Sequence, residues 1–319
     1  MQQIIQHLHH VTATVNDAQE DLDFYVGILG LRLVKQTVNF DNRKVFHFYY
    51  GTEVGYPGTI MTTFPYKGQG VRDGVNGSGQ VQRTSFSIPE NSLSFWKERL
   101  QKAEVSFEEE SRFGESVLKM LDPSGLTIEL IESKDEREPW KTDEIPSAYA
   151  ITGIHSVSLS IADIDTTLNF LENYLGFQRG PREENRQRMI VGKGGAGYQI
   201  DVLHQPELGR GKNGLGTVHH VALAIQTEEE QKALREKIVE LGIRITEVLD
   251  RKYFRSIYFR EPGGVLIEVA TIPPGFTVDE DNENLGLELK LPEWEEPLRA
   301  EIEAGLPKIK HLSAPFSYS

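Results

Sequence analysis

The chain has 319 residues, of which 38% are hydrophobic and 26% are charged, and this is typical of a globular protein long enough for two domains. Its formal net charge of -14 comes without a basic stripe, which argues against nucleic acid as a partner. Cysteine is absent, which removes disulfides and thiolate metal ligands. No segment approaches the ~20 apolar residues that cross a bilayer, and no secretory signal is visible, so we expect a cytoplasmic protein without membrane contact.

Four similar strand starts recur along the chain. Each is followed by a polar turn, a helical segment of roughly three turns and further strand-like runs. They lie at residues 8–11, 81–84, 154–157 and 218–221. Their spacing predicts four βαβββ modules, near residues 5–65, 80–132, 152–204 and 217–272.

Two shorter matches support this duplication. Residues 122–129 read Asp-Pro-Ser-Gly-Leu-Thr-Ile-Glu and residues 261–268 read Glu-Pro-Gly-Gly-Val-Leu-Ile-Glu, so each is a tight turn that leads into an apolar strand. Gly30 and Gly176 each follow a short amphipathic pattern and are expected to stop a helix.

We therefore predict an α+β fold in which the four modules pair into two domains of curved mixed β-sheet, with the helices outside. An N-terminal domain (modules 1 and 2) would span residues 1–135, and a C-terminal domain (modules 3 and 4) would span residues 150–272. Residues 273–319 would form an acidic extension, with a helix near 293–304 packed on the body and no assigned chemistry.

In the first strand, His10 falls on the small and polar face. Because strand side chains alternate, Leu8, His10, Thr12 and Thr14 lie opposite His9 and the apolar residues that share its face. Bulky apolar residues belong under a covering helix, whereas small residues belong where the sheet curls around something that is not protein. We expect His10 to point into this hollow and His9 to point away from it.

The fourth module supplies two further candidates. His220 shares a face with Ala222 and Ala224, while His219 shares the bulky face and should be packed or hydrogen-bonded. Glu268 lies in mid-strand in an apolar run with no basic residue close by in the sequence, and burial of an unpaired carboxylate is costly. A bound metal ion would satisfy this carboxylate.

His10, His220 and Glu268 together predict a divalent metal site. Two imidazoles and one carboxylate leave about three open positions on an octahedral iron(II), which suits activation of dioxygen beside a bound substrate. The absence of thiolates disfavours a closed structural zinc site. Ligand type alone leaves manganese, zinc and nickel open as occupants of a purified sample.

The duplication offers an internal control for this site. The matching positions in the other half-site are Ser156, Arg83 and Glu129. Serine and arginine do not bind a cation there, and Arg83 could neutralise Glu129. We expect one site that carries chemistry and one structural ion pair.

The repeated modules, the His-His-Val strand starts and the Pro-X-Gly…Ile-Glu endings resemble the vicinal oxygen chelate superfamily of glyoxalases, bleomycin resistance proteins and dioxygenases, over residues 5–272. Ligands drawn from the first and fourth modules look like those of ring-cleaving hydroquinone 1,2-dioxygenases. The resemblance implies an extradiol-type iron(II) enzyme that cleaves a hydroquinone-type ring, with a small aromatic molecule and dioxygen as partners. A homo-oligomer is compatible with this resemblance.

The same resemblance implies catalytic roles for His9, Thr12, Arg251 and Tyr258. Tyr258 would act as an acid/base or hydrogen-bond donor, Arg251 would offset negative charge that develops on oxygen, and Thr12 would bond to the ligands or the substrate. His9 could reach the substrate only near a strand end or a bulge. Blander interpretations stay open, namely a β-favouring tyrosine and a surface arginine.

Two other functions also stay open. One is a glyoxalase-type isomerase or lyase, although such enzymes more often have a fourth protein ligand and Ser156 occupies the third-module position. The other is a non-catalytic small-molecule binding protein of the same fold. His155 matches His9 in the repeat and is expected to be structural. The other four histidines receive no role, namely His7, His47, His204 and His311.

Overall fold

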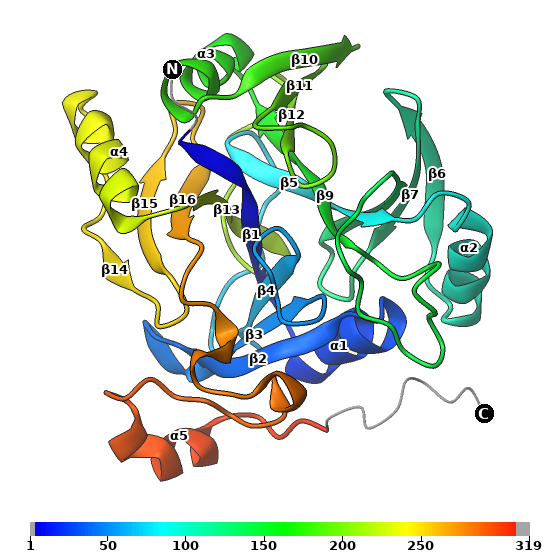
Figure 1. Cartoon of the computed structure of the whole chain (residues 1–319), viewed down its shortest axis with the longest axis vertical. Coiled ribbons are helices and arrows are strands. Elements are labelled where there is room, and N and C mark those ends of the chain that lie inside the picture. Colours follow the sequence, from blue (N-terminus) through cyan, green and yellow to red (C-terminus); the bar gives the residue numbers. More distant parts are fainter. Residues whose placement is uncertain (1–3, 311–319) are drawn as a thin grey trace.

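A computed structural model describes residues 4–310, and four βαβββ modules follow one another along them (Figure 1). The first contains β1 (Ile5–Val15), α1 (Ala18–Leu22) with the π-helical η1 (Asp23–Ile28), β2 (Arg32–Asn39), β3 (Asn42–Gly51) and β4 (Ile60–Pro65). The second contains β5 (Gln80–Ile88), α2 (Leu93–Lys102), β6 (Phe107–Arg112), β7 (Glu115–Leu121) and β8 (Thr127–Glu132). The third contains β9 (Gly153–Ile161), α3 (Ile164–Leu175), β10 (Gln178–Glu183), β11 (Arg186–Ile190) and β12 (Gln199–His204). The fourth contains β13 (Thr217–Ile225), α4 (Glu228–Glu240), β14 (Leu249–Asp250), β15 (Arg255–Arg260) and β16 (Leu266–Thr271).

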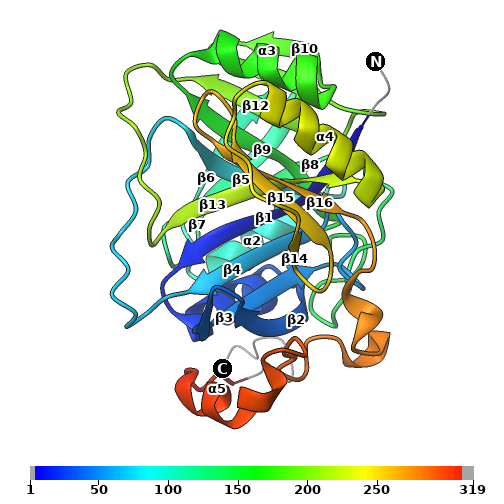
Figure 2. The ribbon, with the colours of Figure 1, turned by 90° about the vertical axis from the view of Figure 1, so that its left-hand side faces the viewer.

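The modules combine into two eight-stranded mixed sheets. The first sheet has the order β14-β15-β16-β13-β1-β4-β3-β2, and the second has the order β10-β11-β12-β9-β5-β8-β7-β6. In each sheet the first strands of two modules pair antiparallel, β1 with β13 and β5 with β9. The helices lie outside the sheets (Figure 2), so the predicted fold class is confirmed.

Each sheet combines one module from the N-terminal half of the chain with one module from the C-terminal half. The first module shares a sheet with the fourth, and the second shares a sheet with the third. A division at residues 1–135 and 150–272 therefore does not coincide with either sheet, and it stays a prediction about how the chain divides. The reason is that the first strand of each module has one edge left free by its own module, and the chain pairs that edge across a long separation.

Turns at the module ends tie sequence neighbours together. Asp122 caps its own turn by accepting the backbone N–H of Leu126 at 2.8 Å, and it also accepts the hydroxyl of Tyr25 at 3.2 Å. Glu261 does the same in the other repeat, accepting the N–H of Val265 at 2.9 Å and the hydroxyl of Thr167 at 2.9 Å. The second module is thus docked on the helical segment of the first, and the fourth on the helix of the third.

The glycine helix stops predicted from the sequence are present. Asp163 caps the start of α3 through the backbone N–H of Thr166, and Gly176 ends this helix in the left-handed conformation with φ +78. Gly30 follows the π-helical turn of the first module with φ +69. Both glycines hold a backbone conformation that a side chain would strain.

The extension after β16 wraps around the first sheet near β2. Lys35 of β2 is fully buried and forms ion pairs with Asp279, at 2.6 Å, and with Glu280. The backbone N–H of Lys290 donates to the carbonyl of Gln36 at 2.9 Å. The expected helix is present as η4 (Glu296–Leu298) followed by α5 (Arg299–Gly305). The rest of the predicted extension, residues 311–319 with His311, lies outside the described residues.

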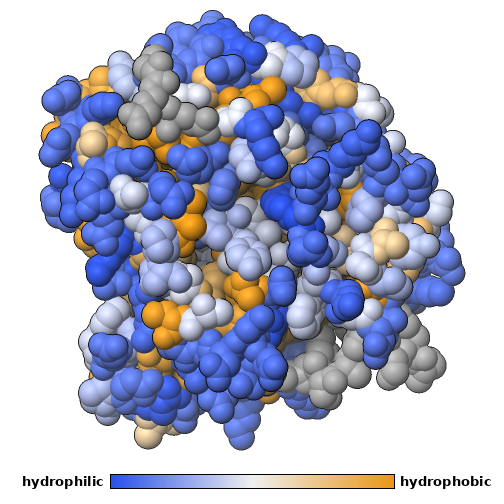
Figure 3. All heavy atoms as spheres, in the orientation of Figure 1, coloured by the Kyte–Doolittle hydropathy of each residue, from blue (hydrophilic) through white to orange (hydrophobic). Residues whose placement is uncertain are grey.

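The surface drawn in Figure 3 is mostly hydrophilic, with scattered apolar side chains. Among residues 4–310, none of the helices is both long and apolar enough to span a lipid bilayer.

Candidate metal centre

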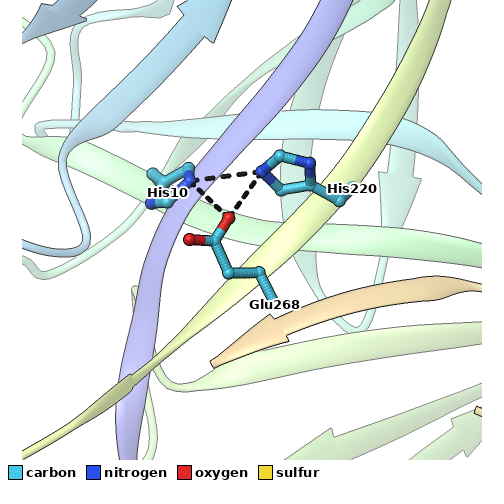
Figure 4. A group of neighbouring side chains, drawn as sticks. All are labelled: His10, His220 and Glu268. Carbon is cyan, nitrogen blue, oxygen red and sulfur yellow. Dashed lines mark hydrogen bonds and ion pairs between the residues drawn. The ribbon is translucent and has the colours of Figure 1, made fainter. Parts of the chain in front are cut away.

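Three side chains from distant parts of the chain converge on one face of the first sheet (Figure 4). His10 comes from β1, His220 from β13 and Glu268 from β16, and all three are buried. Glu268 Oε2 lies 2.7 Å from His220 Nε2 and 3.1 Å from His10 Nε2, and the two imidazole nitrogens are 3.3 Å apart. The structure therefore brings together the three side chains that the sequence selected as metal ligands.

Strand register explains this convergence. His10 pairs with Ala222 across β1 and β13, and Ala222 pairs in turn with Glu268 across β13 and β16. The small alanine between them leaves space for the imidazole and the carboxylate to meet above it. The small residues that the sequence places on this face thus make room for the site.

A cavity of about 420 Å³, called the cup below, opens beside these three side chains. Thr12 and Thr14 line the cup next to His10, as the alternation of β1 predicted. Its other walls are aromatic and polar, and they include Phe40, His47, Tyr49, Phe64, Tyr66, His219, Arg251, Phe254 and Tyr258.

His9 lies behind His10 and does not line the cup. Its Nε2 is 3.3 Å from the carbonyl oxygen of Thr271, and its Nδ1 is 2.9 Å from Nδ1 of His10. A carbonyl oxygen only accepts, so the proton of the neutral His9 ring sits on Nε2. Burial lowers the pKa of His9 well below its ordinary value, which keeps the ring neutral. His10 must then donate from Nδ1, and its Nε2 is left as a free lone pair facing Glu268.

His219 repeats this arrangement beside His220. The two Nδ1 atoms are 2.8 Å apart, so the neighbouring imidazole orients His220 as His9 orients His10. His219 was expected to be packed or hydrogen-bonded, and the hydrogen bond is confirmed, but its ring also lines the cup. The register shifts where β1 meets β13 help to explain why simple alternation does not describe both histidine pairs.

Glu268 is fully buried and only half satisfied by the protein. Ser256 donates to its Oε1 through a short hydrogen bond, whereas Oε2 has no aligned hydrogen-bond donor among residues 4–310. Burial alone would raise the pKa of Glu268, but the interactions with the adjacent His10 and His220 imidazoles outweigh it and hold this pKa well below the ordinary value. An ionised oxygen thus faces two imidazole nitrogens without a hydrogen bond, which is an arrangement that a cation completes.

Tyr258 and Arg251 lie together on the cup wall. Tyr258 pairs with Glu268 across β15 and β16, and its ring is 5.5 Å from that of His220. Arg251 donates from Nε to the Tyr258 hydroxyl at 3.3 Å, and its guanidinium group lies 5.3 Å from the centre of the tyrosine ring. Burial and the charge of Glu268 raise the pKa of Tyr258, so its hydroxyl stays protonated. Both residues line the cup, and their catalytic roles stay a prediction.

Sequence reasoning assigned no role to several residues of this site. Ser256 holds the carboxylate of Glu268, while His47, Tyr49 and Phe254 line the cup. His47 and Tyr49 alternate along β3, which was a usable signal for a shared strand face. Nothing in the local sequence, however, indicated that β3 would lie on the same wall as His10.

The twin half-site in the second sheet holds an ion-pair network. Arg83 donates to Glu129 at 2.8 Å, which confirms the predicted pair. Arg112 also binds both oxygens of Glu129, and this partner was missed. Burial would raise the pKa of Glu129, but the two arginines outweigh it and lower the pKa to about 2. Guanidinium groups supply the positive charge in this half-site.

Comparisons with known proteins agree with this architecture. A family model described as Glyoxalase/Bleomycin resistance protein/Dioxygenase superfamily matches residues 7–130 and 153–269. The chain is 46% identical over 303 residues to a Bacillus subtilis protein named "Putative ring-cleaving dioxygenase MhqE", which covers 95% of this chain and 98% of the relative. It is 38% identical over 308 residues to the chlorohydroquinone/hydroquinone 1,2-dioxygenase of Sphingobium indicum, covering 93% of this chain and 95% of that protein.

A solved structure is similar along almost the whole chain. The crystal structure of a protein called "putative dioxygenase" from Bacillus subtilis aligns with a TM-score of 0.93 at 42% identity, covering 97% of this chain and 99% of that one. The family match includes both halves of the duplicated chain, and the resemblance seen in the sequence is confirmed. The chain belongs to the Glyoxalase/Bleomycin resistance protein/Dioxygenase superfamily.

Proposed function

We propose that this protein is a non-haem iron(II)-dependent dioxygenase that cleaves the ring of hydroquinone-type aromatic molecules. The observation that carries the proposal is the convergence of two imidazole nitrogens and one ionised carboxylate oxygen beside a cavity with aromatic walls. The printed function of a relative at 38% identity supports the choice of a hydroquinone as substrate.

The donor atoms fit a divalent metal. Bonds of about 2.1 Å at right angles place neighbouring ligand atoms about 3 Å apart. The three separations here are 2.7, 3.1 and 3.3 Å. His10, His220 and Glu268 would hold the ion and leave its other positions open toward the cup. When bound, iron(II) would supply the redox chemistry that allows dioxygen to react with an aromatic ring.

His9 and His219 are positioning residues in this proposal. Nδ1 of each residue is hydrogen-bonded to Nδ1 of the adjacent ligand, His10 or His220. This bond fixes the orientation of the ligand ring and directs its Nε2 toward Glu268. Such partners raise the basicity of the ligand and increase metal affinity.

Tyr258 would donate a hydrogen bond to an oxygen of the substrate. Arg251 already donates to the Tyr258 oxygen, so the hydroxyl proton of Tyr258 is left for a second acceptor. The buried positive charge of Arg251 makes this proton more available and offsets negative charge on the substrate oxygen. The cup volume of about 420 Å³ suits a single substituted ring.

The test compares wild type with His220→Ala. We expect wild-type protein purified without added metal to contain stoichiometric iron and to consume oxygen with methylhydroquinone or chlorohydroquinone. His220→Ala should lose the iron and at least ~100-fold in oxygen uptake. The matched control is His155→Ala, which removes a buried histidine from the second sheet, outside the cup.

Two results would contradict the proposal. Equal iron content and equal oxygen uptake in wild type and His220→Ala would remove these three residues as the centre. Zinc, nickel or manganese with turnover that needs no oxygen would instead indicate an isomerase.

A further inference from the structure

A series of hydrogen-bonded side chains runs along one wall of the cup and ends beside the proposed metal ligand His10. Tyr49 Oη lies 2.9 Å from His47 Nδ1, and His47 Nε2 lies 2.8 Å from Thr62 Oγ1. Thr62 Oγ1 lies 2.9 Å from Thr12 Oγ1. We call these four residues, Tyr49, His47, Thr62 and Thr12, the relay.

The relay crosses three adjacent strands of the first sheet. Tyr49 of β3 pairs with Thr62 of β4, and Thr62 pairs with Thr12 of β1. Thr12 is two residues from His10 on the same strand face and pairs with His220 across β13. Tyr49, Thr12 and Thr62 are buried, and His47 is half-buried with its ring against Phe64 at 4.2 Å.

Chemistry gives this relay a direction. A phenolic hydroxyl is a better donor and a poorer acceptor than an aliphatic one, so Tyr49 donates to Nδ1 of His47. The neutral ring of His47 then carries its proton on Nε2 and donates to Thr62. Thr62 already accepts this bond, so it directs its own proton to Thr12. The hydroxyl proton of Thr12 is the one that remains, and Thr12 lines the cup.

We propose that His47, aligned by Tyr49 and acting through Thr62, fixes Thr12 as a hydrogen-bond donor to the ring oxygen of the substrate, which favours binding of the phenolate form. The inference rests on the proposed function, because it needs a phenol-type substrate whose oxygen lies near His10. His47, Tyr49 and Thr62 are positioning residues, whereas Thr12 contacts the substrate. A hydrogen bond to an ionised oxygen is stronger than one to a neutral oxygen, so a fixed donor selects the ionised form.

The relay has no counterpart at the matching position of the second sheet. Ser158 occupies the place of Thr12, because it pairs with Arg83 as Thr12 pairs with His220. Arg186 donates to the Ser158 hydroxyl at 2.8 Å. Ser158 in the second sheet therefore accepts from a charged guanidinium group, whereas Thr12 in the first sheet is bonded to the neutral hydroxyl of Thr62.

The test uses 4-nitrophenol, whose neutral and ionised forms absorb at different wavelengths. Iron-loaded protein is titrated with it under nitrogen, at a pH where the free phenol is mostly neutral. The spectrum reports the ionised fraction of the bound phenol, and the titration gives Kd. Neither readout depends on turnover.

Four variants and one control separate the relay from packing. Thr62→Val is nearly isosteric and removes the link, and His47→Leu removes the donor to Thr62. Each should bind with about a tenfold higher Kd and a lower ionised fraction, with unchanged iron content. Tyr49→Phe should also raise Kd and lower the ionised fraction. Without the Tyr49 hydroxyl, the ring of His47 can adopt the other tautomer, in which Nε2 no longer donates to Thr62. His47→Gln keeps an N–H for Thr62 and should stay within about threefold of wild type. The control His155→Gln should match wild type.

Activity measurements separate an effect on binding of the aromatic substrate from an effect on dioxygen. Thr62→Val should raise KM for methylhydroquinone about tenfold while KM for dioxygen stays near that of wild type. A Thr62→Val protein that retains iron and binds 4-nitrophenol with the wild-type ionised fraction would overturn the inference. Equal losses in His47→Gln and His47→Leu, with iron retained, would also overturn it, because they would indicate packing. A wild type that binds the phenolate but consumes no oxygen with hydroquinones would contradict the proposed function alone.

Discussion

The two sheets place a buried glutamate at the same position and satisfy it in different ways. Glu268 faces two imidazoles and a cavity, while Glu129 is bound by the guanidinium groups of Arg83 and Arg112. Burial alone would raise the pKa of both carboxyl groups, and nearby positive or imidazole groups lower both. The fold thus demands a positive partner at this position, and the neighbouring residues decide whether that partner is a protein cation or an ion from solution.

An arginine at equivalent positions of the two sheets shows how similar the two half-sites are. Arg112 precedes Glu129 by 17 residues, and Arg251 stands at the same distance before Glu268. Arg112 reaches its glutamate, whereas Arg251 stops at the hydroxyl of Tyr258. The residue in the place of Tyr258 is Lys119, which pairs with Glu129 across the strands but binds Glu110 with its side chain. In the first sheet the arginine therefore ends at a tyrosine hydroxyl, and in the second sheet it ends at the carboxylate itself.

The largest effect is expected from copying the twin into the metal centre. His220→Arg puts the residue found at Arg83 beside Glu268, where it can form the same ion pair. We expect a folded protein with no bound iron and a loss of at least ~1000-fold in oxygen uptake, because a guanidinium group does not coordinate a cation. Metal analysis and circular dichroism check both points. Retained iron would show that His220 is not a ligand.

The second-largest effect is expected on stability, in the ion-pair network of the second sheet. Arg112→Leu leaves Arg83 as the remaining cationic partner of the buried Glu129, and it should lower the free energy of unfolding by ~3 kcal/mol, measured by urea denaturation. The double variant Arg112→Leu/Glu129→Gln should recover part of this loss, because the uncompensated charge is gone. Oxygen uptake per folded molecule should not change. A reduced iron content in Arg112→Leu would contradict the division into one chemical and one structural half-site.

Removing the Tyr258 hydroxyl, which accepts a hydrogen bond from Arg251, gives a smaller effect. Tyr258→Phe should lower kcat by ~10- to 100-fold with iron content unchanged, since a donor to the substrate oxygen is lost. The matched control is Tyr174→Phe on the exposed face of α3. Wild-type kcat in Tyr258→Phe would favour the blander interpretation of a tyrosine that only suits a strand.

The smallest effect concerns a buried carboxyl group that has neither an arginine nor a metal. Asp21 accepts hydrogen bonds from Tyr50 and Thr63, and burial raises its pKa to about 8. Between about pH 4 and pH 8 the unfolded chain releases this proton while the folded chain keeps it, so the folded state loses stability as pH rises. Asp21→Asn has no carboxyl group to ionise and therefore lacks this loss. The difference in free energy of unfolding between Asp21→Asn and wild type should shift by ~2 kcal/mol in favour of the variant from pH 5 to pH 8. Parallel stability profiles would show that Asp21 is ionised in the folded protein.

The sequence predicted what depends on local pattern. Strand alternation placed His10, Thr12 and Thr14 on one face, and the acidic-Pro-X-Gly turns aligned Glu129 with Glu268. The selection of His10, His220 and Glu268 used this alternation together with the cost of burying a carboxylate, and the structure brings these atoms within 4.8 Å of one another.

What the sequence could not predict depends on long-range pairing. The sheets combine module 1 with module 4, a choice that no local period encodes. His47 received no role because its partner Thr62 lies on the next strand, 15 residues away, and the contact exists only in the folded sheet. Arg112 was missed for a similar reason, since it reaches Glu129 across two strands of the second sheet.

The pairing of β1 with β13 has a consequence for synthesis. His10 and His220 are 210 residues apart, and the outer edge of β1 has no partner until β13 has left the ribosome. A nascent chain cut short anywhere before β16 lacks the carboxylate of Glu268, so no such fragment can assemble the proposed centre. Closure of so long a loop makes folding slow, and the open edge of β1 is a site for misassembly during that interval. The proposed ion would therefore bind only after nearly the whole chain has emerged.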